Sequence, residues 1–306
     1  MEIVCAHLAG DPQREDVVWT YLTPPQIVDE LARVGTPVCV DTVRNLCDEF
    51  GLHQRQAEKT KTKDEALHRN EQFENIARLR QEFEDTANPI ISMDSKKKEF
   101  IGELFRAGRA YGNGPNVVLD HDYPSWAVGK FIPHGLYDLK RNVGHITLGF
   151  SHDTSQFACD SFRLWWQRHG VRAYPRATSL LLLCDGGGNN NCRHHIFKED
   201  LQRLVNTIGI PIRVAHYPPY CSKYNPIEHR LFPHVARAWS GLIFRTLDIV
   251  KQGLRRVSTS TGLKLTYATL DKVYALQRTV SQSFLNACPL QFAPLLPAWN
   301  YTVAPQ

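Results

Sequence analysis

A short run of apolar residues, Ser179–Cys184, constrains the fold of this chain more than any other segment. The run reads SLLLLC and is followed by Asp185 and three consecutive glycines. It is too short to form a helix of its own, so it predicts a strand that is buried on both faces of a sheet. Asp185 then lies at the carboxyl end of this strand, which is the edge where open α/β sheets bind ligands.

The segments after this strand alternate between helix and strand. Apolar residues recur at helical spacing through residues 197–208, and residues 210–215 form the next predicted strand. Asn225 suits the N-cap of the helix that follows, and Pro226 suits its first turn. Glu228 is therefore predicted just inside this helix, directed back toward the strand ends.

A series of strands precedes the run. Residues 90–93 lead into Asp94 on the first predicted strand, and residues 135–138 and 145–150 are further strand candidates. Residues 154–169 have the apolar spacing of a helix. Strands followed by alternating helices and strands predict an α/β fold, a mixed sheet with helices on its faces.

Two short amphipathic helices are predicted near the N-terminus, at residues 26–34 and 40–50 with a Gly-Thr-Pro turn between them. Their length and turn fit a helix-turn-helix, whose second helix could enter a DNA major groove. Arg44 is the only basic residue of the second helix, beside three acidic ones, which weakens its contact with DNA phosphates. Plain packing of two helices remains the alternative.

Composition narrows the class of protein only a little. The 306 residues carry a formal net charge of +5, which permits a polyanionic partner without requiring one. The eight cysteines show no CxxC spacing, and we expect reduced thiols in a cytosolic protein. No apolar run approaches the roughly 18 residues of a membrane span, so no membrane association is expected.

Three carboxylates come together in this prediction: Asp94 and Asp185 at strand ends and Glu228 at a helix start. Phosphodiester cleavage without a covalent enzyme intermediate needs an activated water and a stabilised leaving oxygen, which two Mg²⁺ ions supply. Mg²⁺ prefers oxygen ligands and keeps several waters, so a few carboxylates suffice. With 31 acidic residues in the chain, spacing alone is weak evidence. Placement at strand and helix ends favours the triad.

Several blocks carry a resemblance to a known family: SMDSKKKEFIGEL from Ser92, GLYDLKRNVGHITLGFSHDT from Gly135, LLLLCDGGGNN from Leu180, CSKYNPIEHRLFPHVARAWSG from Cys221 and STSTGLK from Ser258. Over about residues 19–264 the chain is similar to the DDE transposases of the ISAzo13 insertion-sequence family, which have an RNase H-like core. The resemblance implies that Asp94, Asp185 and Glu228 are the catalytic and metal-binding triad. It also implies cleavage and strand transfer at element ends, with two Mg²⁺ ions for which Mn²⁺ can substitute.

The resemblance further implies partners and an organisation in parts. DNA would be bound both as transposon ends and as target, by a homodimer or larger assembly, in a bacterial cytoplasm at the nucleoid. We expect a partial helix-turn-helix region at 1–53, a linker and helix at 54–88, an RNase H-like DDE catalytic domain at 89–250, and a C-terminal helix and tail at 251–306. Within these parts, we expect residues 54–64 to form the linker and residues 270–284 the C-terminal helix.

Other charged residues are candidates for contact with DNA or for support of the triad. The lysines after Asp94 form either a solvated face or phosphate contacts, and Asp153 is a candidate supporting group. The candidate DNA-binding residues are Lys96, Lys97, Lys98, His229, Arg230 and Arg44.

Two other functions stay open. Members of the family usually carry a longer N-terminal region, so a truncated or domesticated transposase copy that binds DNA without cutting is one alternative. An RNase H-like nuclease of another kind would share the same site. Intact carboxylates favour an active transposase, because a non-catalytic copy has no chemical need for them.

Overall fold

The computed structural model describes residues 8–11, 14–20, 22–53, 68–109, 113–187, 194–219, 221–287 and 289–306. The chain divides into two compact units, residues 1–61 and 62–306. The predicted linker at residues 54–64 lies outside the described residues.

The first unit is a hairpin followed by two helices. β1 (Leu8–Asp11) pairs antiparallel with β2 (Arg14–Thr20), and α2 (Pro24–Arg33) and α3 (Val40–Glu49) follow. The helix pair confirms the predicted one to within two residues at each end. A capping box between Thr23 and Gln26 starts α2, and Gly35, with φ of +82°, makes the turn after it. The hairpin was not predicted.

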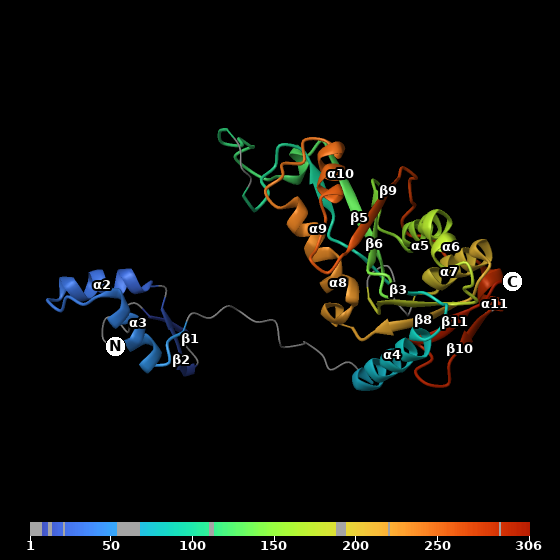
Figure 1. Ribbon diagram of the computed structural model, residues 1–306, viewed down its shortest axis with the longest axis horizontal. Coiled ribbons are helices and arrows are strands. Elements are labelled where there is room, and N and C mark those ends of the chain that lie inside the picture. Colours follow the sequence, from blue (N-terminus) through green and yellow to red (C-terminus); the bar gives the residue numbers. More distant parts are fainter. Residues whose placement is uncertain are drawn as a thin grey trace. The chain divides into compact units, whose positions relative to one another are not determined.

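The second unit is built on a nine-stranded mixed sheet with the order β10-β11-β8-β7-β3-β5-β6-β9 and with β4 paired to β5 (Figure 1). The strands are β3 (Ile90–Ser95), β4 (Glu99–Ile101), β5 (Gly129–Asp138), β6 (Val143–Gly149), β7 (Leu180–Asp185), β8 (Ile212–Tyr217), β9 (Lys264–Leu270), β10 (Leu290–Phe292) and β11 (Asn300–Val303).

The strand directions identify the core. β6, β5 and β3 form an antiparallel meander, whereas β3, β7 and β8 run parallel to one another. Three antiparallel strands continued by two parallel ones are the RNase H-like arrangement, so the expected α/β fold class is confirmed. The parallel strands end at the same edge of the sheet, which brings the residues after them together.

Helices cover both faces of this sheet. They are α4 (Arg69–Glu84), α5 (Ser155–Trp165) with a π-helical turn at Trp166–Gly170, α6 (Val171–Ala173), α7 (His195–Ile208), α8 (Pro226–Arg230), α9 (Phe232–Trp239), α10 (Leu247–Arg255) and α11 (Gln282–Ala287). α5 and α7 pack on one face, and α4 and α8–α10 pack on the other. None of the described helices is both long and apolar enough to cross a membrane.

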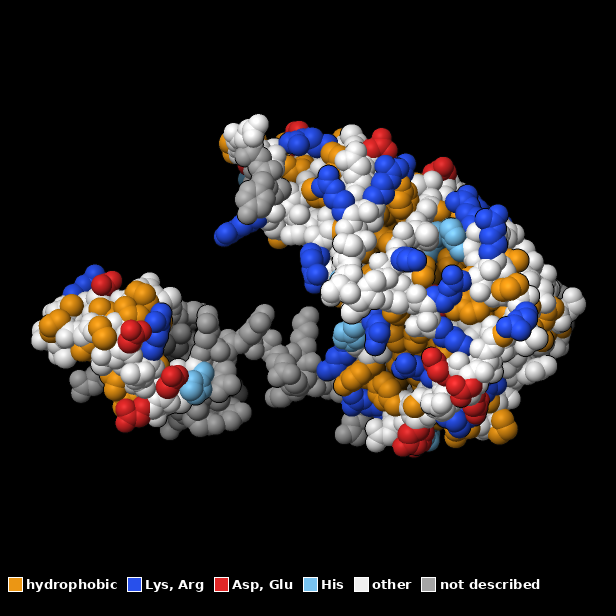
Figure 2. All heavy atoms as spheres, viewed as in Figure 1, with side chains coloured by type: hydrophobic (Ala, Val, Ile, Leu, Met, Phe, Trp, Pro, Cys, Tyr) orange, Lys and Arg blue, Asp and Glu red, His pale blue; other side chains and the backbone are white. Residues whose placement is uncertain are grey.

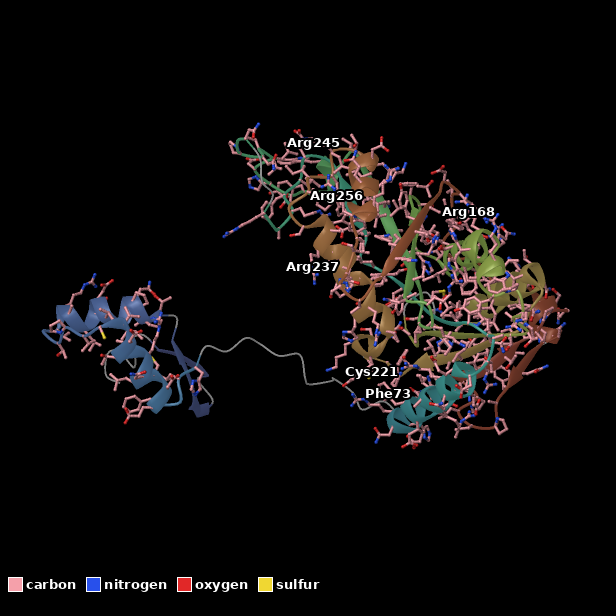
Figure 3. The ribbon with its side chains drawn as sticks, viewed as in Figure 1. Phe73, Arg168, Cys221, Arg237, Arg245 and Arg256 are labelled. Carbon is pink, nitrogen blue, oxygen red and sulfur yellow. The ribbon has the colours of Figure 1, made fainter. Side chains whose placement is uncertain are left out.

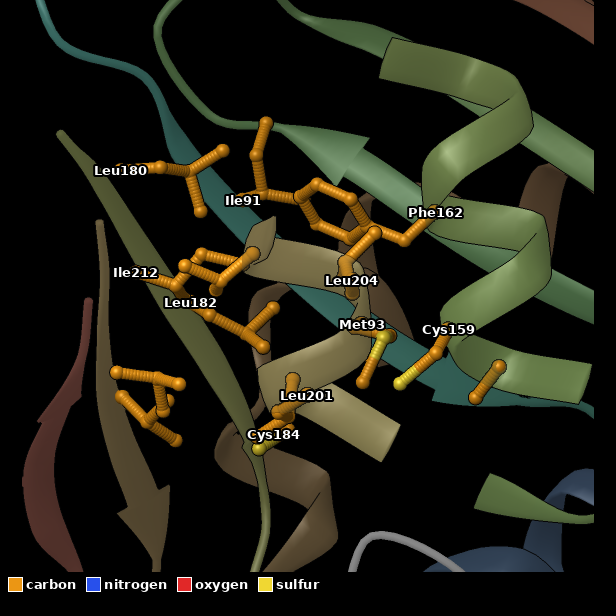
Figure 4. Packing of buried hydrophobic residues seen from close by; sticks show 14 of the residues in the cluster. Ile91, Met93, Cys159, Phe162, Leu180, Leu182, Cys184, Leu201, Leu204 and Ile212 are labelled. Atoms are coloured by element: carbon orange, nitrogen blue, oxygen red, sulfur yellow. The ribbon is translucent and has the colours of Figure 1, made fainter. Parts of the chain in front are cut away.

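The strand β7 shows why the sheet is buried on both sides. Leu180, Leu182 and Cys184 face α5 and α7, as Figure 4 shows, whereas Leu181 and Leu183 face α4. All five are fully buried. Successive strand residues point to opposite faces, so an unbroken apolar run fills both layers. The prediction made from this run is confirmed.

The C-terminal prediction was wrong in part. We expected a helix at residues 270–284, but β9 ends at Leu270 and α11 begins only at Gln282. Val273 and Leu276 are 79% and 58% exposed, while Tyr274 is buried. Packing of this segment against the rest of the fold therefore overrides its local helical pattern. The expected C-terminal tail includes β11, which pairs with β8 and joins the sheet.

Candidate active site

Asp94 and Asp185 lie at the carboxyl ends of two neighbouring parallel strands. Met93 of β3 is the register partner of Cys184 of β7, so the next residue on each strand is a predicted catalytic aspartate. Both side chains are half-buried. The parallel register is therefore what brings together two carboxylates that are far apart in the sequence.

Glu228 reaches the same place from the short helix α8. This helix packs on β5, where Gly135 is the register partner of Asp94. A Cβ on Gly135 would come within 2.7 Å of the Ile227 side chain and 2.6 Å of the Phe232 ring, so the close approach of α8 requires glycine here. The structure thus brings Asp94, Asp185 and Glu228 together, as the sequence predicted.

The electrostatics of the site reflect this crowding. Burial raises the pKa of Asp94, and the negative charge of Asp185 and a hydrogen bond to Glu228 raise it further, to about 8. Burial also raises the pKa of Asp185 to about 6, with Glu228 adding to the effect and a hydrogen bond from Asn225 opposing it. Like charges gathered in a partly buried place are costly, and a bound cation would relieve that cost.

Asn225 departs from its predicted role. It occupies the N-cap position of α8, but its side chain makes no capping hydrogen bond. The side chain is fully buried and turned inward, where Nδ2 donates to the Met93 carbonyl over 3.3 Å and to Asp185 Oδ1 over 3.2 Å. Its Oδ1 accepts a hydrogen bond from the hydroxyl of Ser92. Sequence reasoning missed Ser92 altogether, because a serine inside a strand gives no signal.

A second set of hydrogen bonds involves the backbone of Asp185. His216 on β8 is 1% exposed, and its Nδ1 lies 3.1 Å from the Asp185 backbone oxygen. Its Nε2 lies 3.0 Å from the Tyr301 hydroxyl on β11. Burial lowers the pKa of His216 to about 4, so the ring is neutral at pH 7. The C-terminal strand therefore supports the strand that carries Asp185.

Asp153 lies next to the triad, as expected for a supporting group. The hydroxyl of Ser95 donates to Asp153 over 2.9 Å, and the Ser95 amide donates to Asp94 over 2.7 Å. Ser95 therefore connects the two aspartates.

The three lysines after Asp94 differ in environment. Lys96 forms a 2.9 Å ion pair with Glu99 and lies 5.7 Å from the centre of the Trp239 ring. Its side chain is 19% exposed, so it is held within the protein and not displayed to solvent. Lys97 and Lys98 are exposed.

The remaining candidate DNA contacts are also on the surface. His229 and Arg230 are exposed beside Glu228 on α8. Arg44 belongs to the other unit, where it forms a 2.9 Å ion pair with Asp41 on the same helix. This pairing partly neutralises the only basic residue of α3.

Basic charge is concentrated in the second unit. Residues 1–61 contain six Lys and Arg against ten Asp and Glu, whereas residues 62–306 contain thirty against twenty-one. Figure 2 shows Lys and Arg side chains spread over the visible face of the second unit. Figure 3 labels four exposed arginines: Arg168 in the π-helical turn after α5, Arg237 on α9, and Arg245 and Arg256 near the two ends of α10. The unit that carries the triad is therefore also the one suited to a polyanion.

The donor set fits a hard divalent cation. Within the described residues, no group of three or more His, Cys, Asp or Glu side chains converges so that all could bind one ion. Mg²⁺ does not need such a cage, because it keeps several waters and takes one or two carboxylates together with substrate phosphates. Asp94, Asp185 and Glu228 supply oxygen donors only, and they meet that requirement.

Comparisons with known proteins give the context of this site. Among curated proteins, none matches the sequence. Among solved structures, similar chains occur in the Mos1 transposase paired-end complex with left transposon end (16% identity, TM-score 0.48), the mariner Mos1 paired end complex with Mg (16%, 0.49) and a pre-cleavage Mos1 transpososome (15%, 0.48). Each match covers 76% of this chain and 66% of the solved chain, so this chain spans just under two thirds of their length.

The model of one protein family matches nearly the whole sequence. The match runs over residues 1–305, and the family is described as the Rhodopirellula transposase DDE domain. It includes all three carboxylates, the strands that carry two of them and the helix that carries the third. This confirms the resemblance to the ISAzo13 family, and the chain belongs to the family of DDE transposase domains.

Proposed function

We propose that this protein is a DNA transposase that cleaves DNA strands and transfers them at the ends of an insertion sequence. The observation that carries the proposal is the convergence of Asp94, Asp185 and Glu228 at one edge of an RNase H-like sheet. Membership of the DDE transposase family supports it.

In this proposal the three carboxylates hold two divalent ions, Mg²⁺ or Mn²⁺. When bound, these ions would activate the attacking water or hydroxyl and stabilise the leaving oxygen. The residues of the chain have separate tasks. β3 and β7 fix two carboxylates on rigid strands, α8 adds the third, and the exposed Arg230 on α8 would contact a DNA phosphate.

DNA is the proposed partner, as both transposon end and target. The excess of basic residues in the unit 62–306 supports this, and Lys97, Lys98, His229 and Arg230 are its proposed contacts nearest the triad. Transposition joins both ends of an element, so we expect a homodimer or a larger assembly on DNA. The proposed setting is the cytoplasm, at the nucleoid.

The division of labour along the chain is also a proposal. Residues 89–250 would form the catalytic domain, preceded by a helix-turn-helix region at 1–53 and by a linker and helix at 54–88. Residues 251–306 would complete the fold, since they supply β9 to one edge of the sheet and β10 and β11 to the other.

The test is cleavage of labelled linear DNA that carries the ends of the element, with Mg²⁺, with Mn²⁺ or with EDTA. Wild type is compared with Asp185→Asn and with Asp138→Asn. Asp138 is a matched control, because it is a buried carboxylate on β5 whose partner is the Tyr174 hydroxyl. It lies at the opposite end of β3 from the triad, as the register partner of Ile91.

We expect nicking at the element ends that depends on a metal ion, is lost in Asp185→Asn and persists in Asp138→Asn. Cleavage that survives in Asp185→Asn would overturn the proposed site. Binding of the ends without cleavage by the wild-type protein would instead indicate a copy that binds DNA without cutting.

A further inference from the structure

We propose that Asn225 and Ser92 are positioning residues that set the three carboxylates relative to one another. The inference rests on the proposed function, since it concerns the metal-binding geometry of the same site. Neither residue is expected to touch DNA or the reacting atoms, because both are fully buried.

One residue connects all three carboxylate-bearing segments. Asn225 donates to the Met93 carbonyl, directly before Asp94, and to the carboxylate of Asp185. Its backbone oxygen accepts a 3.0 Å hydrogen bond from the amide of Glu228. A shift of Asn225 would therefore move β3, β7 and α8 against one another.

Ser92 completes the connection from the strand side. Its hydroxyl donates to Asn225 Oδ1 and accepts from the amide of Ile227 over 3.1 Å. That amide lies in the first turn of α8, where backbone N–H groups lack helical partners. Ser92, on strand β3, therefore takes the place of an N-cap residue for α8. This contact fixes the start of α8 to β3, two residues before Asp94.

The chemistry of the site selects an amide at position 225. The two acceptors, the Met93 carbonyl and the Asp185 carboxylate, both require N–H donors, whereas the Ser92 hydroxyl donates to an acceptor. An asparagine side chain offers both in one plane. An aspartate would direct lone pairs at both acceptors, and an apolar side chain would remove the hydrogen bonds to the Met93 carbonyl, the Asp185 carboxylate and the Ser92 hydroxyl. Outer groups that orient metal-binding carboxylates typically contribute roughly 10–100-fold in metal affinity or activity.

The experiment measures Mn²⁺ binding by the electron paramagnetic resonance signal of the free ion, without DNA. The variants are Asn225→Ala and Ser92→Ala, so that one variant remains if the other fails to fold. Asn300→Ala and Ser161→Ala are matched controls. Both are fully buried and hydrogen-bonded, Asn300 to Asn75 and Ser161 to Thr147, away from the carboxylates. Thermal melts of all four report the loss of stability.

We expect both site variants to weaken Mn²⁺ binding, Asn225→Ala by roughly tenfold or more, and to raise the Mn²⁺ concentration that gives half-maximal cleavage. The controls should lower the melting temperature but leave Mn²⁺ affinity unchanged. Wild-type Mn²⁺ affinity in both site variants would overturn this inference and leave the proposed function standing. A wild-type protein that neither binds Mn²⁺ nor cleaves the element ends with Mn²⁺ would overturn the proposed function, and this inference with it.

Discussion

Asp94 lies beside Asp185 at the carboxyl ends of β3 and β7, and the two residues directly follow a pair of register partners. Burial raises the pKa of Asp94, and the charge of Asp185 raises it further, to about 8. The same proximity that suits the pair to bind cations makes it costly without them. The site therefore lowers the stability of the metal-free protein.

Asp94→Asn is expected to stabilise the metal-free protein at pH 8 while it abolishes cleavage. In the unfolded chain this carboxyl ionises above about pH 4, whereas in the folded protein it keeps its proton until about pH 8. Wild type therefore loses stability as the pH rises between these values, and the neutral amide does not. Urea unfolding in EDTA should show a gain on the order of 2–4 kcal/mol at pH 8 that shrinks toward pH 4. A less stable variant at pH 8 would contradict this account.

Three buried histidines predict the opposite dependence on pH. Burial lowers the pKa of His134 and His145 to about 3 and that of His216 to about 4. Below about pH 6.5 the histidines of the unfolded chain bind protons that the folded protein cannot bind. The free energy of unfolding therefore decreases as the pH is lowered. Each histidine should cost up to about 2 kcal/mol at pH 5.

The measurement needs a variant that lacks both Asp94 and Asp185. In the wild-type protein, Asp94 holds a proton over the same range of pH only in the folded state, so lowering the pH adds stability, which would mask the loss from the histidines. We would compare urea unfolding of Asp94→Asn/Asp185→Asn at pH 7 and pH 5. Addition of His134→Asn to this background should reduce the loss between the two pH values. An unchanged free energy of unfolding from pH 7 to pH 5 would show that the histidines are not held neutral.

Arg278 holds the C-terminal segment onto α7. Its guanidinium donates to the carboxylate of Asp200, which is 2% exposed and also accepts from Ser155 over 2.6 Å. Arg278→Ala leaves the buried carboxylate with only the more distant Arg203, at 3.8 Å, as a cationic partner and should cost about 3 kcal/mol, measured by urea unfolding. Lys272→Ala is the control, because Lys272 pairs with Asp160 but is 48% exposed and should cost less than about 1 kcal/mol. Equal losses of unfolding free energy in the two variants would show that burial of Asp200 does not strengthen its ion pair.

Gly135→Ala should disturb both the fold and the site. The added Cβ would meet Ile227 and Phe232, so α8 must move away from β5 and carry Glu228 with it. We expect a loss of about 1–3 kcal/mol and a reduced rate of strand cleavage. Gly114→Ala is the matched control, since a Cβ there meets nothing within 4 Å. Full cleavage activity in Gly135→Ala would mean that the site tolerates a displaced α8.

Much of the fold followed from local patterns. The apolar run at β7 predicted a strand buried on both faces, and the order of strands and helices predicted the α/β class. Strand ends and a proline at a helix start located the three carboxylates. These signals are local, because the backbone and its nearest neighbours decide where a strand ends or a helix begins.

Other features depended on contacts between distant segments. Asn225 has the sequence position of a helix cap, yet its side chain turns inward to Ser92, which is 133 residues away. Lys96 belongs to a basic run, but it pairs with Glu99 and lies over Trp239. Residues 271–281 carry a helical pattern and form no helix, because Tyr274 and Arg278 find partners on α5 and α7.

The sequence by itself determined five strands of the sheet, β3, β5, β6, β7 and β8, and the two aspartates that follow β3 and β7, since both depend on the order of apolar and polar residues. Only the tertiary structure decided how those carboxylates are held. The hydrogen bonds of Asn225, Ser92 and His216 join strands and helices that are far apart in the chain. A buried polar side chain takes whichever partners the packed fold places beside it, and local sequence contains no record of those partners.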